Sequence, residues 1–338
     1  MPKARCLDVV FPRPIRRGNL FKMEGRMRQC LPFTLLIVLV WTASVSLAGA
    51  QSQAIPTESV TVNAQKLAPE EKLHDFVQAY AAPAGVGGKM ARWKDGICPI
   101  VAGLPQAHAK FVAERVRQVA GLAGAPVADA KSCKPNIDIV FTLKPQVLLD
   151  DVRKKHRVFL GYHDAAEELH LATVTHPVQA WYTTQTVDLN GSTYIDDKLR
   201  NHGGFYIMVP RGAGYEQIFI PDARVAHVTG SHLGDGISSE LYHVIIIVDL
   251  ARVQGQSVGA LADYAAMLSL AQTQSFEACA PVASITNLVS QGCEAVVKPE
   301  TITVNDLGYL QGLYRIDPRA SFAHQQGDLV MQMSKEGR

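Results

Sequence analysis

The sequence contains few of the short motifs that identify a reaction. It has no phosphate-binding loop, no G-x-G-x-x-G fingerprint and no cysteine pair with the C-x-x-C spacing typical of zinc sites. Only 19% of its residues are charged, and the basic ones form no stripe outside the N-terminus. Nucleic acid is therefore not an expected partner, because contacts to phosphate supply most of that affinity. The same absences predict no cofactor and no metal.

The N-terminus is the most informative part of the chain. A basic segment precedes an apolar run at residues 31–47, and the small residues 48–50 follow it. This pattern is typical of a secretory signal, so residues 1–50 are interpreted as a signal peptide cleaved near Ala50. A membrane anchor is the alternative, but a spanning helix needs about 20 predominantly apolar residues and this run is shorter. We expect a periplasmic or secreted protein without a transmembrane helix after cleavage.

The charge of the chain is divided unevenly by this cleavage site. Residues 1–50 hold eight of the 33 Lys and Arg but two of the 31 Asp and Glu. Residues 51–338 therefore have 25 basic and 29 acidic side chains, a net charge of −4. The long basic segment leaves three alternative translation starts, which are Met1, Met23 and Met27.

Four of the six cysteines remain after cleavage, an even number that suits an oxidising compartment. Three connectivities of two disulfides are possible. We favour Cys98–Cys133 and Cys279–Cys293, because the members of each pair lie close together in the sequence. The shorter loop would contribute about 3 kcal/mol if disulfides act through chain entropy.

The rest of the chain divides into three parts. Residues 51–67 are expected to form a flexible segment with a short strand, residues 68–316 a single globular domain, and residues 317–338 a polar tail. Apolar residues at helical spacing predict helices at 105–123, 145–155 and 258–271, one opened by Pro69, and one that Thr303 and Asp306 cap. The fold class is α/β or α+β, with a mixed β-sheet flanked by amphipathic helices.

The most apolar segment of the mature chain is residues 244–248, five consecutive β-branched residues. Such a run predicts a central strand buried on both faces. Asp249 follows at its carboxyl end, where ligands bind in open α/β sheets, and is a candidate site residue. The alternative is that Asp249 caps a turn or pairs with Arg252.

Two groups of histidines are further candidates for chemistry. His163 and His170 lie near two glutamates, but their spacing of seven places them two helical turns apart, too far to share one ion. His227, His232 and His243 form the second group, which spans a glycine-rich segment and ends directly before the apolar run 244–248. Solvated loops are the simpler interpretation of both groups.

A third group of polar residues surrounds Asn190 and Gly191. Their order predicts a tight hairpin turn. Neighbouring aspartates invite a calcium interpretation, but their spacing does not match the calcium-binding loop.

Three stretches resemble a group of uncharacterised exported proteins of Gram-negative bacteria: residues 238–249, 259–268 and 306–314. This resemblance implies an exported protein without an assigned reaction. A second similarity, to metzincin-like zinc proteases, rests on a buried strand followed by a long helix, here 258–271. That helix contains no histidine, so the similarity implies a scaffold that has lost its zinc motif.

The sequence thus favours an exported, non-catalytic protein with a binding or envelope-associated role. The alternative is an exported hydrolase, with or without a metal, whose histidines and carboxylates are brought together by the fold. The ligand, the partners and the oligomeric state do not follow from the sequence.

Overall fold

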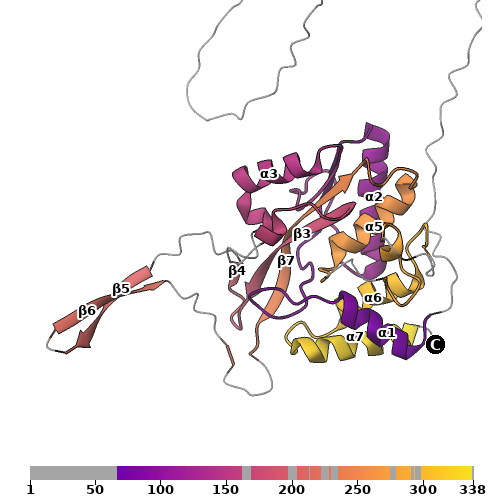
Figure 1. The fold of residues 1–338 in the computed structure, drawn as a ribbon. Coiled ribbons are helices and arrows are strands. Elements are labelled where there is room, and N and C mark those ends of the chain that lie inside the picture. The colour runs from indigo at the N-terminus through magenta and orange to yellow at the C-terminus, as the bar shows by residue number, and fades with distance from the viewer. Residues whose placement is uncertain are drawn as a thin grey trace, which may run out of the picture. The chain divides into compact units, whose positions relative to one another are not determined.

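The chain folds around a mixed β-sheet with helices on both sides, an α+β architecture (Figure 1). The computed structural model describes residues 67–161, 169–196, 204–212, 214–221, 228–229, 235–274, 279–290, 293 and 298–336. The predicted leader, the predicted strand within residues 51–67, His163, His227 and His232 lie outside the described residues.

The strands are β1 (Pro99–Ala102), β2 (Ile137–Thr142), β3 (Val178–Val187), β4 (Thr193–Ile195), β5 (Gly204–Arg211), β6 (Gly214–Pro221) and β7 (Ser238–Asp249). The helices are α1 (Glu70–Tyr80), α2 (Gln106–Ala123), α3 (Pro145–Lys155), α5 (Val258–Leu270), α6 (Val304–Arg315) and α7 (Phe322–Glu336). Two short 3-10 helices are η1 (Arg157–Leu160) and η2 (Ile285–Asn287).

Five strands form the main sheet in the order β1-β2-β7-β3-β4. β1, β2 and β7 run parallel, with Ile137 opposite Val244, whereas β3 runs antiparallel to β7 and β4 antiparallel to β3. The turn between β3 and β4 contains Asn190 and Gly191, and Asp188 accepts hydrogen bonds from the backbone N–H groups of Asn190 and Ser192. The hairpin predicted there is confirmed.

β7 is the central strand, and residues 244–248 are buried on both faces as predicted. Val244, Ile246 and Val248 face the larger core, which is built with α1, α2, α5, α6 and α7. Ile245 and Ile247 face a smaller cluster with Trp181 and with α3 and η1. Figure 1 shows α3 on one side of the sheet and α2 and α5 on the other.

Local patterns explain why several elements form where they do. The stripe of α1 (Leu73, Phe76, Val77 and Tyr80) is fully buried, as its helical spacing predicts. β2 alternates between buried and half-buried residues, the period of a strand that packs one face on the core. At α6, the Thr303 hydroxyl accepts from the Asp306 backbone and the Asp306 carboxylate accepts from the Thr303 backbone, which confirms the predicted capping box.

The polar tail expected over residues 317–338 is wrong for most of its length. Residues 322–336 form α7, which packs against α1 and α6 with Leu329, Val330 and Met333 buried. Gln325 and Gln326 occupy buried positions of the same stripe, so the sequence there does not show a continuous apolar pattern. Gln325 accepts a hydrogen bond from the Met90 backbone and donates one to the Asp317 carbonyl, so its amide is satisfied inside the fold.

Candidate functional site

Asp249, the candidate at the end of the central strand, has a local structural role. Its carboxylate accepts a hydrogen bond of 3.0 Å from the Ala251 backbone N–H, and its carbonyl accepts from two residues of the following turn. The Arg252 guanidinium donates to the Thr175 carbonyl. The turn-capping interpretation of Asp249 thus matches the contacts, and the pairing with Arg252 does not.

Among the candidates His163, His170, His227 and His232, only His170 lies in the described residues, and its side chain is exposed. Within the described residues, no group of three or more His, Cys, Asp or Glu side chains is arranged to hold a metal ion. Asp196, which follows β4, accepts hydrogen bonds from the hydroxyls of Thr184 and Thr186.

The four cysteines form the two disulfides that the sequence favours, Cys98–Cys133 and Cys279–Cys293. The first links the segment before β1 to the segment before β2. The Arg117 guanidinium lies 3.5 Å from the Cys133 sulfur and also donates to the Ala128 carbonyl. α2 and both cysteine-bearing segments are thereby held together beside the pocket described next.

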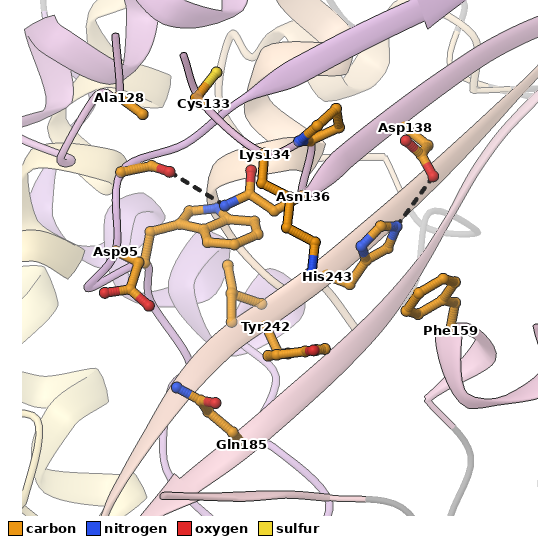
Figure 2. A pocket seen from close by; sticks show the side chains of 14 residues that line it. Asp95, Ala128, Cys133, Lys134, Asn136, Asp138, Phe159, Gln185, Tyr242 and His243 are labelled. Atoms are coloured by element: carbon orange, nitrogen blue, oxygen red, sulfur yellow. Dashed lines mark hydrogen bonds and ion pairs between the residues drawn. The ribbon is translucent and has the colours of Figure 1, made fainter. Parts of the chain in front are cut away.

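A pocket of about 550 Å³ opens at the amino-terminal ends of the parallel strands (Figure 2). This is the edge of the sheet opposite to Asp249, which ends β7. Six parts of the chain supply the lining described here, namely the segments before β1 and β2, the start of β2, the η1 helix, the end of β3 and the first half of β7. The volume falls within the range of about 300–1,000 Å³ that is typical of small-molecule sites.

A β-bulge in β7 shapes one wall of this pocket. Thr183 of β3 pairs with His243, but the next residue, Thr184, pairs with Leu241, so Tyr242 is an extra residue without a partner across the pair. In a regular strand neighbouring side chains point to opposite faces, yet Leu241, Tyr242 and His243 all line the pocket. The bulge explains this, since an inserted residue redirects side chains beside it.

The second ordered feature of the pocket is an imidazole–carboxylate pair. His243 Nε2 lies 3.1 Å from Asp138 Oδ2, across the adjacent strands β7 and β2. The Phe159 ring stacks on the imidazole, with centroids 4.1 Å apart and planes 12° from parallel, and the His156 ring also stacks on Phe159. His243 is buried, whereas about a third of the Asp138 side chain is exposed. The orientation of the His243 imidazole is therefore fixed by the Phe159 ring on its face and by Asp138 at Nε2.

Asn136, which also lines the pocket, joins neighbouring segments of the chain. Its side-chain oxygen accepts a hydrogen bond of 2.7 Å from the backbone N–H of Cys98, and its side-chain amide N–H donates to the Gly96 carbonyl. The backbone carbonyl of Asn136 accepts a hydrogen bond from the Val244 backbone N–H. The side chain of Asn136 thus joins the segments before β1 and β2, and its backbone joins the start of β2 to β7.

Charged and amide groups surround the remaining space. Lys134, Asp95 and Gln185 line it together with Asp138, and Figure 2 shows Lys134, Gln185, Tyr242 and His243 around the same space. Glu240, on β7, accepts a hydrogen bond of 2.8 Å from Gln185 and lies 3.5 Å from the Lys94 ammonium. The pocket thus presents hydrogen-bond donors and acceptors of both charge signs.

An imidazole oriented by a carboxylate is the base half of a nucleophile–base–acid arrangement. The described residues that line the pocket include no serine or threonine, and the one cysteine, Cys133, is in a disulfide. The arrangement can bind a polar ligand and exchange a proton with it.

Residues 255–259 have the G-x-S-x-G spacing of serine-hydrolase nucleophile elbows. The backbone at Ser257 is extended (φ −71°, ψ 150°), and its hydroxyl accepts a hydrogen bond from the Ala260 N–H as the N-cap of α5. Ser257 is therefore a helix cap, and the pentapeptide does not form the strained turn of an elbow.

The residues of this site could be found only in part from the sequence. His243 and Asp138 are 105 positions apart and lie in separate strands. The single signal was a histidine directly before the most apolar run of the chain, a position where a polar ring needs a partner. Phe159 and Tyr242 carried no signal at all.

Comparison with protein-family models, with curated proteins and with solved structures finds no match to this chain. The resemblances to exported proteins of Gram-negative bacteria and to a zinc-protease scaffold stay predictions.

Proposed function

We propose that this chain is an exported protein that binds a small polar ligand in the pocket at the amino ends of β2 and β7, without transforming it. The observation that carries the proposal is the wall built by the β7 bulge and by the stack of Phe159 on His243. A hydrogen bond and a ring stack hold this wall in one arrangement, and preorganisation lowers the free-energy cost of binding.

The export half of the proposal rests on the leader and on the cysteines. The leader has the three parts of a secretory signal. Two disulfides are the expected state of cysteines in an oxidising compartment. In the part of the chain that the structure describes, no helix has the length and apolar character needed to cross a membrane.

Binding without catalysis is favoured by what surrounds His243. Its Nε2 is engaged by Asp138 and its ring face is covered by Phe159, which suits a fixed wall. Serine and threonine are missing from the described lining residues, and the one cysteine there is in a disulfide. A fixed imidazole without a serine or a free thiol beside it suits recognition better than acyl transfer.

Thermal unfolding in the presence of single compounds tests the binding proposal, because a ligand that binds only the folded state stabilises it by mass action. The purified protein is screened against sugars, amino acids and nucleotides, and each hit is measured by calorimetry. His243→Phe keeps a ring to stack on Phe159 but removes the bond to Asp138, so we expect weaker binding. His324→Phe is the matched control, since His324 forms an exposed pair with Asp328. Equal loss in both variants, or no hit in any class, contradicts the proposal.

A hydrolase is the second candidate, favoured by the 3.1 Å contact between His243 and Asp138. Its test is turnover of peptide, ester and glycan substrates by purified protein, with and without a chelator. If His243→Gln abolishes an activity while the variant keeps the native fold, catalysis replaces the non-catalytic proposal. Activity that persists in that variant would place catalysis elsewhere.

A further inference from the structure

We propose that the ligand of this pocket is a neutral saccharide, with a sugar ring seated against the exposed Tyr242 ring. The inference rests on the proposed binding function of the same pocket. It comes from three features of the lining: the orientation of its rings, the mixture of its hydrogen-bonding groups and the near balance of its charges.

Tyr242 is the ring available for contact. It is 38% exposed, although it lies in the central strand of the sheet between the buried residues Leu241 and His243. The bulge places it on the pocket wall and leaves it without a cross-strand partner to cover it. Pyranose rings present flat faces of C–H groups, which pack on aromatic faces because the ring face carries partial negative charge. A flexible or spherical ligand gains less from such a surface.

The polar lining matches hydroxyl groups, which both donate and accept. Lys134 can only donate, the Asp95 and Asp138 carboxylates can only accept, and the Gln185 amide does both. A sugar satisfies such a mixed set at once, because each hydroxyl turns toward whichever group is nearest.

The charges of the lining argue against ionic ligands. Two carboxylates, Asp95 and Asp138, face one ammonium, Lys134, beside an imidazole. A phosphate or a nucleotide would meet two carboxylates in a site without an arginine among its described lining residues, and anion sites depend on cations or on clustered N–H groups. An organic cation would meet Lys134. A neutral ligand avoids both repulsions.

The test is calorimetric titration of the purified protein with glucose, galactose, mannose, N-acetylglucosamine, cellobiose, lactose and N,N′-diacetylchitobiose. We expect at least one of them to bind. Tyr242→Ala should then weaken its binding about tenfold, the order of one aromatic stacking contact. Tyr242→Phe should bind nearly as well as the native protein, because the ring face is kept.

Tyr215→Ala is the matched control, because Tyr215 is an exposed tyrosine on β6 that is not part of the described pocket lining. Its affinity should equal that of the native protein. Equal weakening by Tyr242→Phe and Tyr242→Ala would overturn the stacking argument in favour of a hydroxyl contact. Binding of glutamate, choline or inorganic phosphate, with none of the seven sugars, would reject the saccharide and leave the binding function standing. Failure of every probe would reject both.

Discussion

The Arg115 guanidinium and the Asp263 carboxylate form a two-armed ion pair inside the core, joining α2 to α5. Both side chains are more than 90% buried, and Asp263 also accepts a hydrogen bond from the Ile302 backbone before α6. Three parts of the larger core thus meet at one carboxylate.

Removal of one partner should therefore destabilise the protein strongly. Asp263→Asn leaves a buried guanidinium opposite a neutral amide, and we expect a loss of about 3–5 kcal/mol in the free energy of unfolding. Replacing both residues, Arg115→Met with Asp263→Leu, should cost less than the sum of the single changes. Urea unfolding measures all three. Lys110→Met on the same helix breaks only an exposed pair with Glu114 and should change little. A comparable loss there would show that α2 is sensitive to any change.

The Cys98–Cys133 disulfide should support the pocket as well as the fold. Its two segments contain Gly96 and Lys134, which line the pocket, and Asn136 bonds to the backbone of Cys98. Replacing both cysteines with serine should lower the free energy of unfolding by about 2–5 kcal/mol. The same double replacement should also lower the affinity of the pocket for any ligand found to bind there. Replacing Cys279 and Cys293 should cost stability but leave that affinity unchanged, and a loss of affinity in both variants would contradict the local role.

β7 allows a direct contrast between a buried and a turn position. Ile246→Asp places a carboxylate in the core without a partner, which costs several kcal/mol or forces its protonation. Because a domain has about 5–15 kcal/mol of total stability, this variant should aggregate or fail to fold. Asp249→Asn retains an oxygen that accepts from Ala251, so its stability should stay close to the native value. Circular dichroism and gel filtration of both variants check this, and a folded Ile246→Asp protein would be inconsistent with the core position.

Three tyrosines whose hydroxyl groups are buried predict a loss of stability at alkaline pH. Burial raises the pKa of Tyr182, Tyr264 and Tyr309 above the ordinary value of 10. An acid whose pKa is higher in the folded than in the unfolded state stabilises the fold fully below the unfolded pKa. That stabilisation is lost as pH rises through the folded pKa. Unfolding in urea should become easier above about pH 10, with phenolate absorbance at 295 nm appearing together with the loss of structure. Ionisation of all tyrosines in a protein that stays folded would contradict this.

The signal peptide that the sequence predicts implies a specific N-terminus after the proposed export. Because small residues occupy positions 48 and 50, intact-mass measurement of periplasmic material should find a chain that begins at Gln51 or within a few residues of it. A chain that keeps its leader and is recovered in the membrane fraction would favour the anchor instead.

Local patterns in the sequence were enough to predict most of the described helices and the central strand. The stripe of α1, the apolar run of β7 and the cap at Thr303 each depend on neighbours within a few positions. The disulfide pairing followed for the same reason, because each pair closes a short loop. α7 was missed where buried glutamines broke the pattern, since what satisfies Gln325 is the backbone of a distant segment.

The pocket was decided by the tertiary structure. His243 and Asp138 meet because β2 and β7 pair in parallel with Ile137 opposite Val244, and a shift of one residue would turn their side chains to opposite faces. Tyr242 reaches the pocket because β7 has one residue more than β3 at that point. Strand register and bulges depend on pairing between residues far apart in the chain, so no local pattern encodes them. The sequence by itself determined the elements and their buried faces, whereas strand pairing brought the residues of the site together.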